Sequence, residues 1–135
     1  MNQAIACVTY LVRDYDEAIA YFRTALGFRL LEDTPLGEGK RWVRVQPEGG
    51  GGPSLLLAQA ATQQQAACVG RQAGGRVFLF LHTEDFARDH ARMKAAGVTF
   101  LESPRQEAYG IVAVFEDLYG NRWDLIEPQP RGAAA

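Results

Sequence analysis

The fold is decided by a stretch that occurs twice, as "LVRDYDEAIAYFRTALGFRLLE" (Leu11 to Glu32) and as "LHTEDFARDHARMKAAGVTFLE" (Leu81 to Glu102). The two stretches align without a gap at an offset of seventy residues, so that Gly27 falls on Gly97. A repeat of this kind predicts that the chain contains the same structural unit twice.

The first copy predicts a strand, a helix and a second strand. Ile5 to Val12 is β-branched and apolar, which favours a strand. Asp14 followed by Glu17 is a capping-box pattern that predicts a helix start, and Gly27 suits the left-handed residue at its end. One face of this helix carries apolar residues at helical spacing: Ala18, Ile19, Phe22 and Leu26. A second strand is expected over Phe28 to Leu31.

The second copy predicts the same order of elements. Val77 to His82 is expected to form a strand, and a helix is expected from about Glu84 to Ala96. Gly97 ends that helix, and Val98 to Leu101 predicts the next strand. Glu84 aligns with Asp14, the capping residue of the first copy.

Each copy is followed by apolar runs that predict two more strands. They are Arg41 to Val45 and Ser54 to Ala58 in the first half, and Gly110 to Phe115 and Arg122 to Glu127 in the second. Each half is therefore β-α-β-β-β, and the fold class is α+β. Because one helix covers only one face of a four-stranded sheet, we expect the two open faces to enclose a shared cavity.

The composition indicates one domain over residues 1–135, with a first module over 4–60, a linker over 61–75 and a second module over 76–128. A net charge of −2 does not indicate a basic surface that would bind nucleic acid or an anionic membrane. Without a signal peptide or a membrane-spanning run, a cytoplasmic location is expected. Cys7 and Cys68 are expected to be free thiols, and Arg131 to Ala135 a frayed tail.

Two motifs point to a known family. They are "VTYLVRDYDEAIAYFRTALGF" (Val8 to Phe28) and "FEDLYGNRWDLIE" (Phe115 to Glu127), and the second is similar to an Asp-Pro-x-Gly-Asn turn with Leu118 in the proline position. With the repeat, the chain resembles the vicinal oxygen chelate superfamily of glyoxalase I, extradiol dioxygenases and the bleomycin- and fosfomycin-resistance proteins. This resemblance implies two βαβββ modules in an incomplete eight-stranded barrel around a cavity, and a homodimer.

The resemblance also implies where a metal would be bound. Metal-using members hold a divalent ion with four side chains from four strands, usually histidines and glutamates. Those positions fall here on Cys7, Leu56, Val77 and Asp124. Since Leu56 and Val77 have no donor atom, only two ligands remain, which is too few. No cofactor is therefore expected, and no divalent metal.

Asp124 lies in the middle of the last apolar strand, and its side chain is expected to point into the cavity. A carboxylate there is costly unless it is hydrogen-bonded or paired. It could pair with Thr9 or with an arginine of "RWVRV" (Arg41 to Val45), or it could meet a donor or cation on a ligand. It could also act as a general acid with a raised pKa.

Other side chains are ambiguous at this level. Trp42 and Arg44 share one strand face, and either line the cavity as a stacking surface and an anion partner or belong to the core and a sheet edge. Tyr109 lies at a strand entry, where a loop could close over a ligand. His82 has the opposite parity to the first residue of its strand and is expected to face away from the cavity. His90 is expected on the packing face of its helix.

The leading hypothesis is a metal-independent member of this superfamily that binds a small, partly apolar organic molecule. It would act by sequestration or resistance, or as an enzyme without a metal, with Asp124 as the one candidate catalytic residue. The residues expected to contact the molecule are Cys7, Thr9, Trp42, Arg44, Leu56, Val77, Tyr109 and Asp124. The alternatives are a metal-dependent lyase or dioxygenase of the glyoxalase I or extradiol type, and a purely structural or regulatory dimer.

Overall fold

The computed structural model describes residues 1–129. The tail expected at Arg131 to Ala135 lies outside the described residues. The chain divides into two compact units, Met1–Gln72 and Ala73–Ala135. Most of the segment expected as a linker, 61–75, thus belongs to the first unit.

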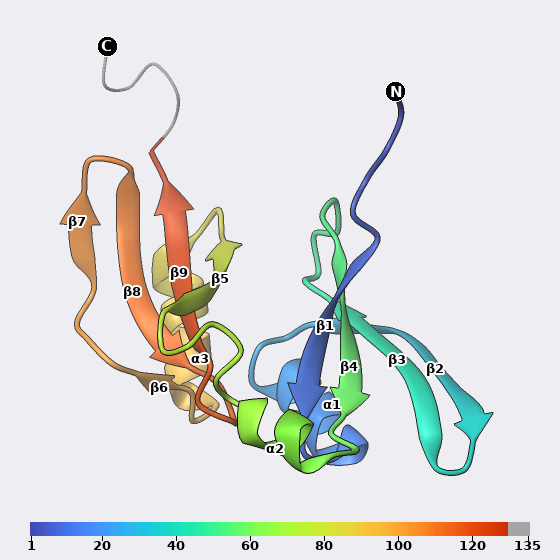
Figure 1. Ribbon diagram of the computed structural model, residues 1–135. Coiled ribbons are helices and arrows are strands. Elements are labelled where there is room, and N and C mark those ends of the chain that lie inside the picture. Colours follow the sequence, from blue (N-terminus) through green and yellow to red (C-terminus); the bar gives the residue numbers. More distant parts are fainter. Residues whose placement is uncertain (130–135) are drawn as a thin grey trace. The chain divides into compact units, whose positions relative to one another are not determined.

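The first unit holds a four-stranded sheet and two helices (Figure 1). Its elements are β1 (Cys7–Val12), α1 (Tyr15–Thr24), β2 (Arg29–Gly37), β3 (Lys40–Gln46), β4 (Ser54–Gln59) and α2 (Gln63–Cys68). The strand order is β1-β4-β3-β2, with β1 parallel to β4 and the other pairs antiparallel. The expected βαβββ order is confirmed.

Helix α1 begins where the capping pattern predicts. The side chain of Asp14 accepts a hydrogen bond of 2.8 Å from the backbone N–H of Glu17. The apolar stripe of α1 covers one face of the sheet, where Tyr10 of β1 packs edge-on against Phe22 at 5.4 Å. The other buried side chains on this face are Val12, Val43, Val45, Leu55 and Leu57. The alternate residues of these strands form the opposite, open face.

A β-bulge in β2 changes which side its residues face. Leu30 pairs with Val45, whereas Glu32 pairs with Arg44, so the register skips Leu31. Strict alternation would put Glu32 on the same face as Leu30. The inserted residue instead places Glu32 beside Arg44 on the open face.

The expected linker contains a helix that the sequence did not suggest. Thr62 caps α2 by accepting from the N–H of Gln65 at 3.1 Å, although none of the helix is buried. The segment then returns to the sheet, where the Gln72 amide donates to the carbonyl of Thr9 at 2.9 Å and accepts from the N–H of Leu11. Because β1 is an edge of its sheet, Gln72 satisfies backbone groups that would otherwise be open.

The second unit repeats the plan with one strand more. Its elements are β5 (Val77–His82), α3 (Phe86–Ala95), β6 (Thr99–Phe100), β7 (Arg105–Glu107), β8 (Gly110–Glu116) and β9 (Arg122–Pro128). The order is β5-β9-β8-β6, with β7 also paired to β8, and β5 parallel to β9. The strands β6 and β7 both pair with β8 and lie one after the other along one edge of the sheet. Neither sheet is closed into a barrel.

Helix α3 starts one residue later than the repeat predicts. Its cap is Asp85, which accepts from the N–H of Arg88 at 3.0 Å, and not Glu84. Asp85 is the better choice because its short side chain reaches the first-turn N–H groups. The strand expected over Val98 to Leu101 is reduced to the two residues of β6.

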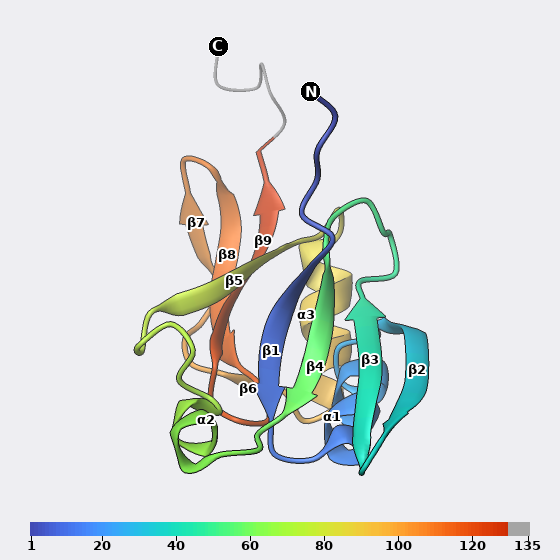
Figure 2. The same ribbon diagram turned by 45° about the vertical axis from the view of Figure 1, so that its right-hand side comes forward.

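Helix α3 lies against β9 of its sheet (Figure 2). Aromatic side chains join this helix to the sheet. His90 stacks on Phe86 at 5.2 Å and approaches Phe100 at 4.4 Å. Phe100 contacts Phe115, which stacks on Trp123 at 5.6 Å. His90 therefore lies on the packing face of its helix, as expected, where burial and the charge of Lys94 lower its pKa.

Two further expectations can be compared with the structure. Cys7 and Cys68 are both free thiols. No helix within residues 1–129 is long and apolar enough to cross a membrane.

Candidate functional site

The open face of the first sheet brings together five of the expected ligand contacts. Thr9 pairs with Leu56, and Leu56 pairs with Arg44, which places the three in one row across the sheet. Cys7 and Trp42 lie on the same face, each two strand positions from this row and on opposite sides of it. Trp42 and Arg44 both lie on the face that α1 leaves open.

Glu32 fixes the side chains of Trp42 and Arg44. Its Oε1 accepts from the indole N–H of Trp42 at 3.1 Å and from Nε of Arg44 at 2.8 Å. Nη1 of Arg44 also donates to the hydroxyl of buried Ser54 at 3.2 Å. Arg44 belongs to β3, an inner strand, and is not an edge charge. The sequence analysis missed Glu32 because the strand it expected ended at Leu31, whereas β2 runs to Gly37.

The open face of the second sheet carries Asp124. Asp124 pairs with Val114 on β8 and with Phe80 on β5. Trp123 and its alternate neighbour Leu125 face α3, so the expected alternation in β9 is confirmed. Phe80 is 61% exposed, which leaves a large apolar side chain uncovered beside the acid.

A second bulge corrects the expectation for His82. The register between β5 and β9 shifts between Val77 and Leu79, and His82 pairs with Ile126. Ile126 and Asp124 lie on the same face of β9, so His82 shares that face and does not point away from it. Val77 is on this face as well, paired with Arg122. His82 is nonetheless exposed, as expected of a surface histidine.

Asp124 is buried without a full set of partners. Its residue is 7% exposed, and its Oδ1 has no hydrogen-bond partner within residues 73–129. In the first unit, Arg41 pairs with Asp33 at 2.7 Å and Arg44 pairs with Glu32 at 2.8 Å.

An ion pair near Asp124 sets its electrostatic environment. Burial raises the pKa of Asp124, the charge of Arg105 opposes this, and the charge of Glu102 adds to it. Arg105 itself is bound to Glu102 at 3.0 Å. Glu102 also accepts from the N–H of Val114 at 2.9 Å, in the interval between β6 and β7. The sequence analysis missed this pair because it expected no strand at Arg105.

Tyr109 precedes β8 and is 52% exposed, so it lies on the surface as a turn residue. Its hydroxyl takes part in a hydrogen bond with Arg105 that helps to raise the pKa of that guanidinium. Tyr109 is thus tied to the same charged group that acts on Asp124.

The residues at the implied metal positions do not fit a metal ion. Cys7 and Asp124 offer a thiol and a carboxylate, while Leu56 and Val77 offer only hydrocarbon. Within residues 1–129 no group of three or more histidine, cysteine, aspartate or glutamate side chains is placed to hold one. Three protein ligands is the usual minimum at a catalytic zinc.

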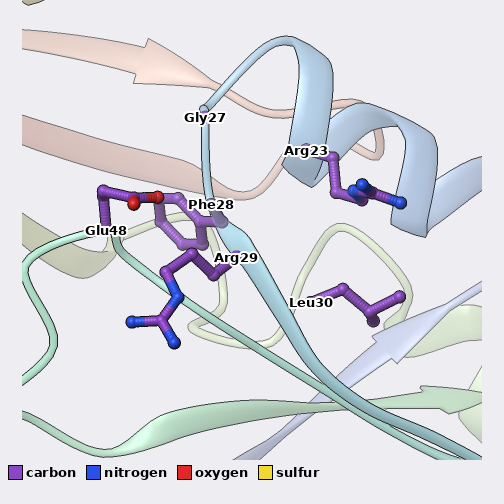
Figure 3. A pocket seen from close by; sticks show the side chains of 6 residues that line it. All are labelled: Arg23, Gly27, Phe28, Arg29, Leu30 and Glu48. Atoms are coloured by element: carbon purple, nitrogen blue, oxygen red, sulfur yellow. The ribbon is translucent and has the colours of Figure 1, made fainter.

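A pocket of about 520 Å³ lies on the other side of the first unit (Figure 3). It is formed around the end of α1 and the start of β2 by Arg23, Gly27, Phe28, Arg29, Leu30 and Glu48. The guanidinium groups of Arg23 and Arg29 point in different directions and do not converge on one point (Figure 3). This pocket contains none of the expected ligand contacts.

Comparison with known proteins agrees with the family resemblance found in the sequence. The family described as Glyoxalase/Bleomycin resistance protein/Dioxygenase superfamily matches residues 4–125. The chain is 53% identical over 128 residues to a protein of Shewanella frigidimarina (strain NCIMB 400) described as uncharacterized, covering 94% of this chain and 95% of that one.

Two solved structures are similar over nearly the whole chain. The crystal structure of UcmS2 has a TM-score of 0.81 and 29% identity, covering 94% of this chain and 99% of that chain. The crystal structure of TnmS3, an antibiotic binding protein from Streptomyces sp. CB03234, has a TM-score of 0.78 and 29% identity, covering 95% and 98%.

Proposed function

This chain belongs to the glyoxalase/bleomycin resistance protein/dioxygenase superfamily, and from that premise we propose that it binds a small, partly apolar organic molecule without a metal ion. Binding would serve sequestration or a reaction that needs no metal. The similarity to TnmS3, an antibiotic binding protein, supports a binding role.

The observation that carries the proposal is the unpartnered carboxyl of Asp124. A buried oxygen without a hydrogen bond costs free energy that folding alone does not recover. Apolar side chains flank it on the same face, Val112 and Val114 on β8 and Ile126 on β9. An apolar surface with one unsatisfied acceptor suits a ligand that is mostly hydrocarbon and has one N–H or O–H donor.

We expect Asp124→Asn to weaken ligand binding while leaving the fold intact. Compounds that raise the melting temperature of the parent protein are first selected from a library of metabolites and drugs. Loss of a hydrogen bond to a charged group costs about 1.5–3 kcal/mol, so the Kd of such compounds should rise roughly tenfold or more. Titration calorimetry of both proteins measures the change, with exposed Glu84→Gln as the charge control.

The same variant should be more stable than the parent at neutral pH. Because burial raises the pKa of Asp124 above its ordinary 3.8, the folded state binds the proton more tightly than the unfolded state. The charged form therefore costs stability above the folded pKa, and this cost disappears below 3.8. Urea melts should show a higher midpoint for Asp124→Asn at pH 7 and no difference near about pH 3. A large loss of stability with unchanged affinity would make Asp124 structural.

Metal content separates this function from a metal-dependent lyase or dioxygenase. We expect less than about a tenth of an equivalent of any divalent metal after dialysis of protein purified without chelator, because two donors do not hold an ion. Plasma emission spectrometry measures it. One equivalent that survives dialysis would instead favour the metal-dependent class.

The homodimer and the cytoplasmic location also belong to this proposal. Support for the dimer comes from the edge strands β2 and β5, whose outer backbone groups are available for pairing.

A further inference from the structure

The open face of the first sheet carries the exposed ring of Trp42 beside the guanidinium of Arg44, and Glu32 orients both groups. Trp42 is 37% exposed, and no other ring or cation within Met1–Gln72 stacks on it. Its indole N–H is held by Glu32, which limits rotation of the ring. An exposed indole that is fixed in this way is a binding surface that loses little entropy when a flat molecule covers it.

Arg44 supplies hydrogen-bond donors beside this surface. Its Nε and Nη1 donate to Glu32 and Ser54, while Nη2 has no hydrogen bond within Met1–Gln72. The side chain is 31% exposed on the open face. Leu56, the neighbour of Arg44 on β4, provides an apolar contact next to it.

The charge of this group decides what kind of acceptor fits. Arg44 and Glu32 form an ion pair at 2.8 Å, so together they carry no net charge. An anionic ligand group at Nη2 would gain little net attraction, because the carboxylate of Glu32 offsets much of the guanidinium charge, and it would lose its hydration. A neutral oxygen accepts from Nη2 with a much smaller loss of hydration.

We propose that this face binds a planar aromatic group bearing a neutral carbonyl oxygen, with the ring on Trp42 and the oxygen on Arg44. The inference rests on the proposed function and names the chemical class of its ligand. It concerns the first sheet alone, so it can be tested separately from the role of Asp124.

The test uses four small probes and the two indole signals of the protein. The probes are 2-acetylnaphthalene, 2-ethylnaphthalene without an acceptor, 2-naphthoate with a charge, and acetylcyclohexane without a planar ring. Nitrogen-15 correlation spectra follow the N–H of Trp42, and Trp123 is an internal control because its indole is buried and bonded to Asp117.

We expect 2-acetylnaphthalene to move the Trp42 signal with saturation and to leave the Trp123 signal unchanged. Its Kd should be about tenfold lower than that of 2-ethylnaphthalene, which forms no hydrogen bond, or of 2-naphthoate, whose charged carboxylate loses more hydration. Acetylcyclohexane should bind about three- to tenfold more weakly, since it lacks ring stacking.

Matched variants separate the contribution of ring stacking on Trp42 from that of the hydrogen bond from Arg44. Trp42→Leu should remove the advantage of the planar ketone over acetylcyclohexane, and Trp42→Phe should keep most of it. Arg44→Lys retains a charge for Glu32 but loses the guanidinium fork, so it should abolish the preference for the ketone over 2-ethylnaphthalene. Circular dichroism melts confirm that each variant is folded before titration.

The outcomes distinguish this inference from the proposed function. If library compounds bind and depend on Asp124, but none of the probes moves the Trp42 signal, the inference is overturned and the binding function stands. If 2-naphthoate binds as well as the ketone, the neutral acceptor is wrong. If the ketone binds through Trp42 and Arg44 while Asp124→Asn changes no affinity, the inference stands and the role of Asp124 falls.

Discussion

Replacement of Gly110 by alanine is expected to disrupt the pairing of β8 with β9 and to produce a large loss of stability. Gly110 has a φ of +146°, and a Cβ there would lie 2.1 Å from the backbone carbonyl oxygen of Glu127. A strained backbone and overpacking each cost about 1–3 kcal/mol, so the sum is roughly 3 kcal/mol or more. Urea denaturation followed by circular dichroism measures it.

Gly97→Ala is the matched control for this experiment. Gly97 also has a positive φ, +92°, but nothing lies within 4 Å of the position that a Cβ would take there. Gly97→Ala should therefore lower the free energy of unfolding only by the cost of a left-handed backbone at a non-glycine residue, roughly 1–2 kcal/mol. The difference between the two variants isolates the clash with Glu127, and equal midpoints would show that β9 moves aside without cost.

Asp117→Asn is expected to destabilise the second unit almost as strongly. Oδ1 of Asp117 accepts from the backbone N–H groups of Tyr119, Gly120 and Asn121 at 2.9–3.1 Å. Its Oδ2 accepts from the indole N–H of Trp123 at 3.0 Å. Burial raises the pKa of this carboxyl, and hydrogen bonds from Trp123, Tyr119 and Asn121 oppose that effect.

The asparagine has one acceptor and one donor where the aspartate has two acceptors. If its oxygen keeps the backbone donors, its NH₂ faces the indole N–H of Trp123, and a buried donor loses its partner. The expected cost is about 2–3 kcal/mol, from a lost hydrogen bond to a charged group. A double-mutant cycle with Trp123→Phe tests the reason, because the cost of Asp117→Asn should fall when the indole N–H is absent. An unchanged cost would assign the effect to the turn alone.

The sequence predicted the local elements well because each depends on neighbouring residues. The cap at Asp14 and the apolar stripe of α1 are patterns within one helix, and both appear in the structure. Alternation in β9 likewise placed Trp123 and Asp124 on opposite faces.

Elements with weak local signals were not predicted. Helix α2 has the sequence "QQQAAC" and no buried residue, so it has no apolar stripe to detect. Strand β7 has the short polar sequence "RQE", which becomes a strand only because the edge of β8 is available to it.

By itself, the sequence determined the repeated βαβββ plan and the superfamily, and it predicted a departure from a metal-binding set at Leu56 and Val77. Only the tertiary structure decided which side chains contact one another. Two β-bulges, in β2 and β5, shift the alternation of side chains between the two faces of a strand, which a sequence pattern assumes to be regular. One bulge brings Glu32 to Trp42 and Arg44, and the other puts His82 on the face of Asp124. The register between strands depends on pairing over long sequence distances, and a local pattern does not contain that information.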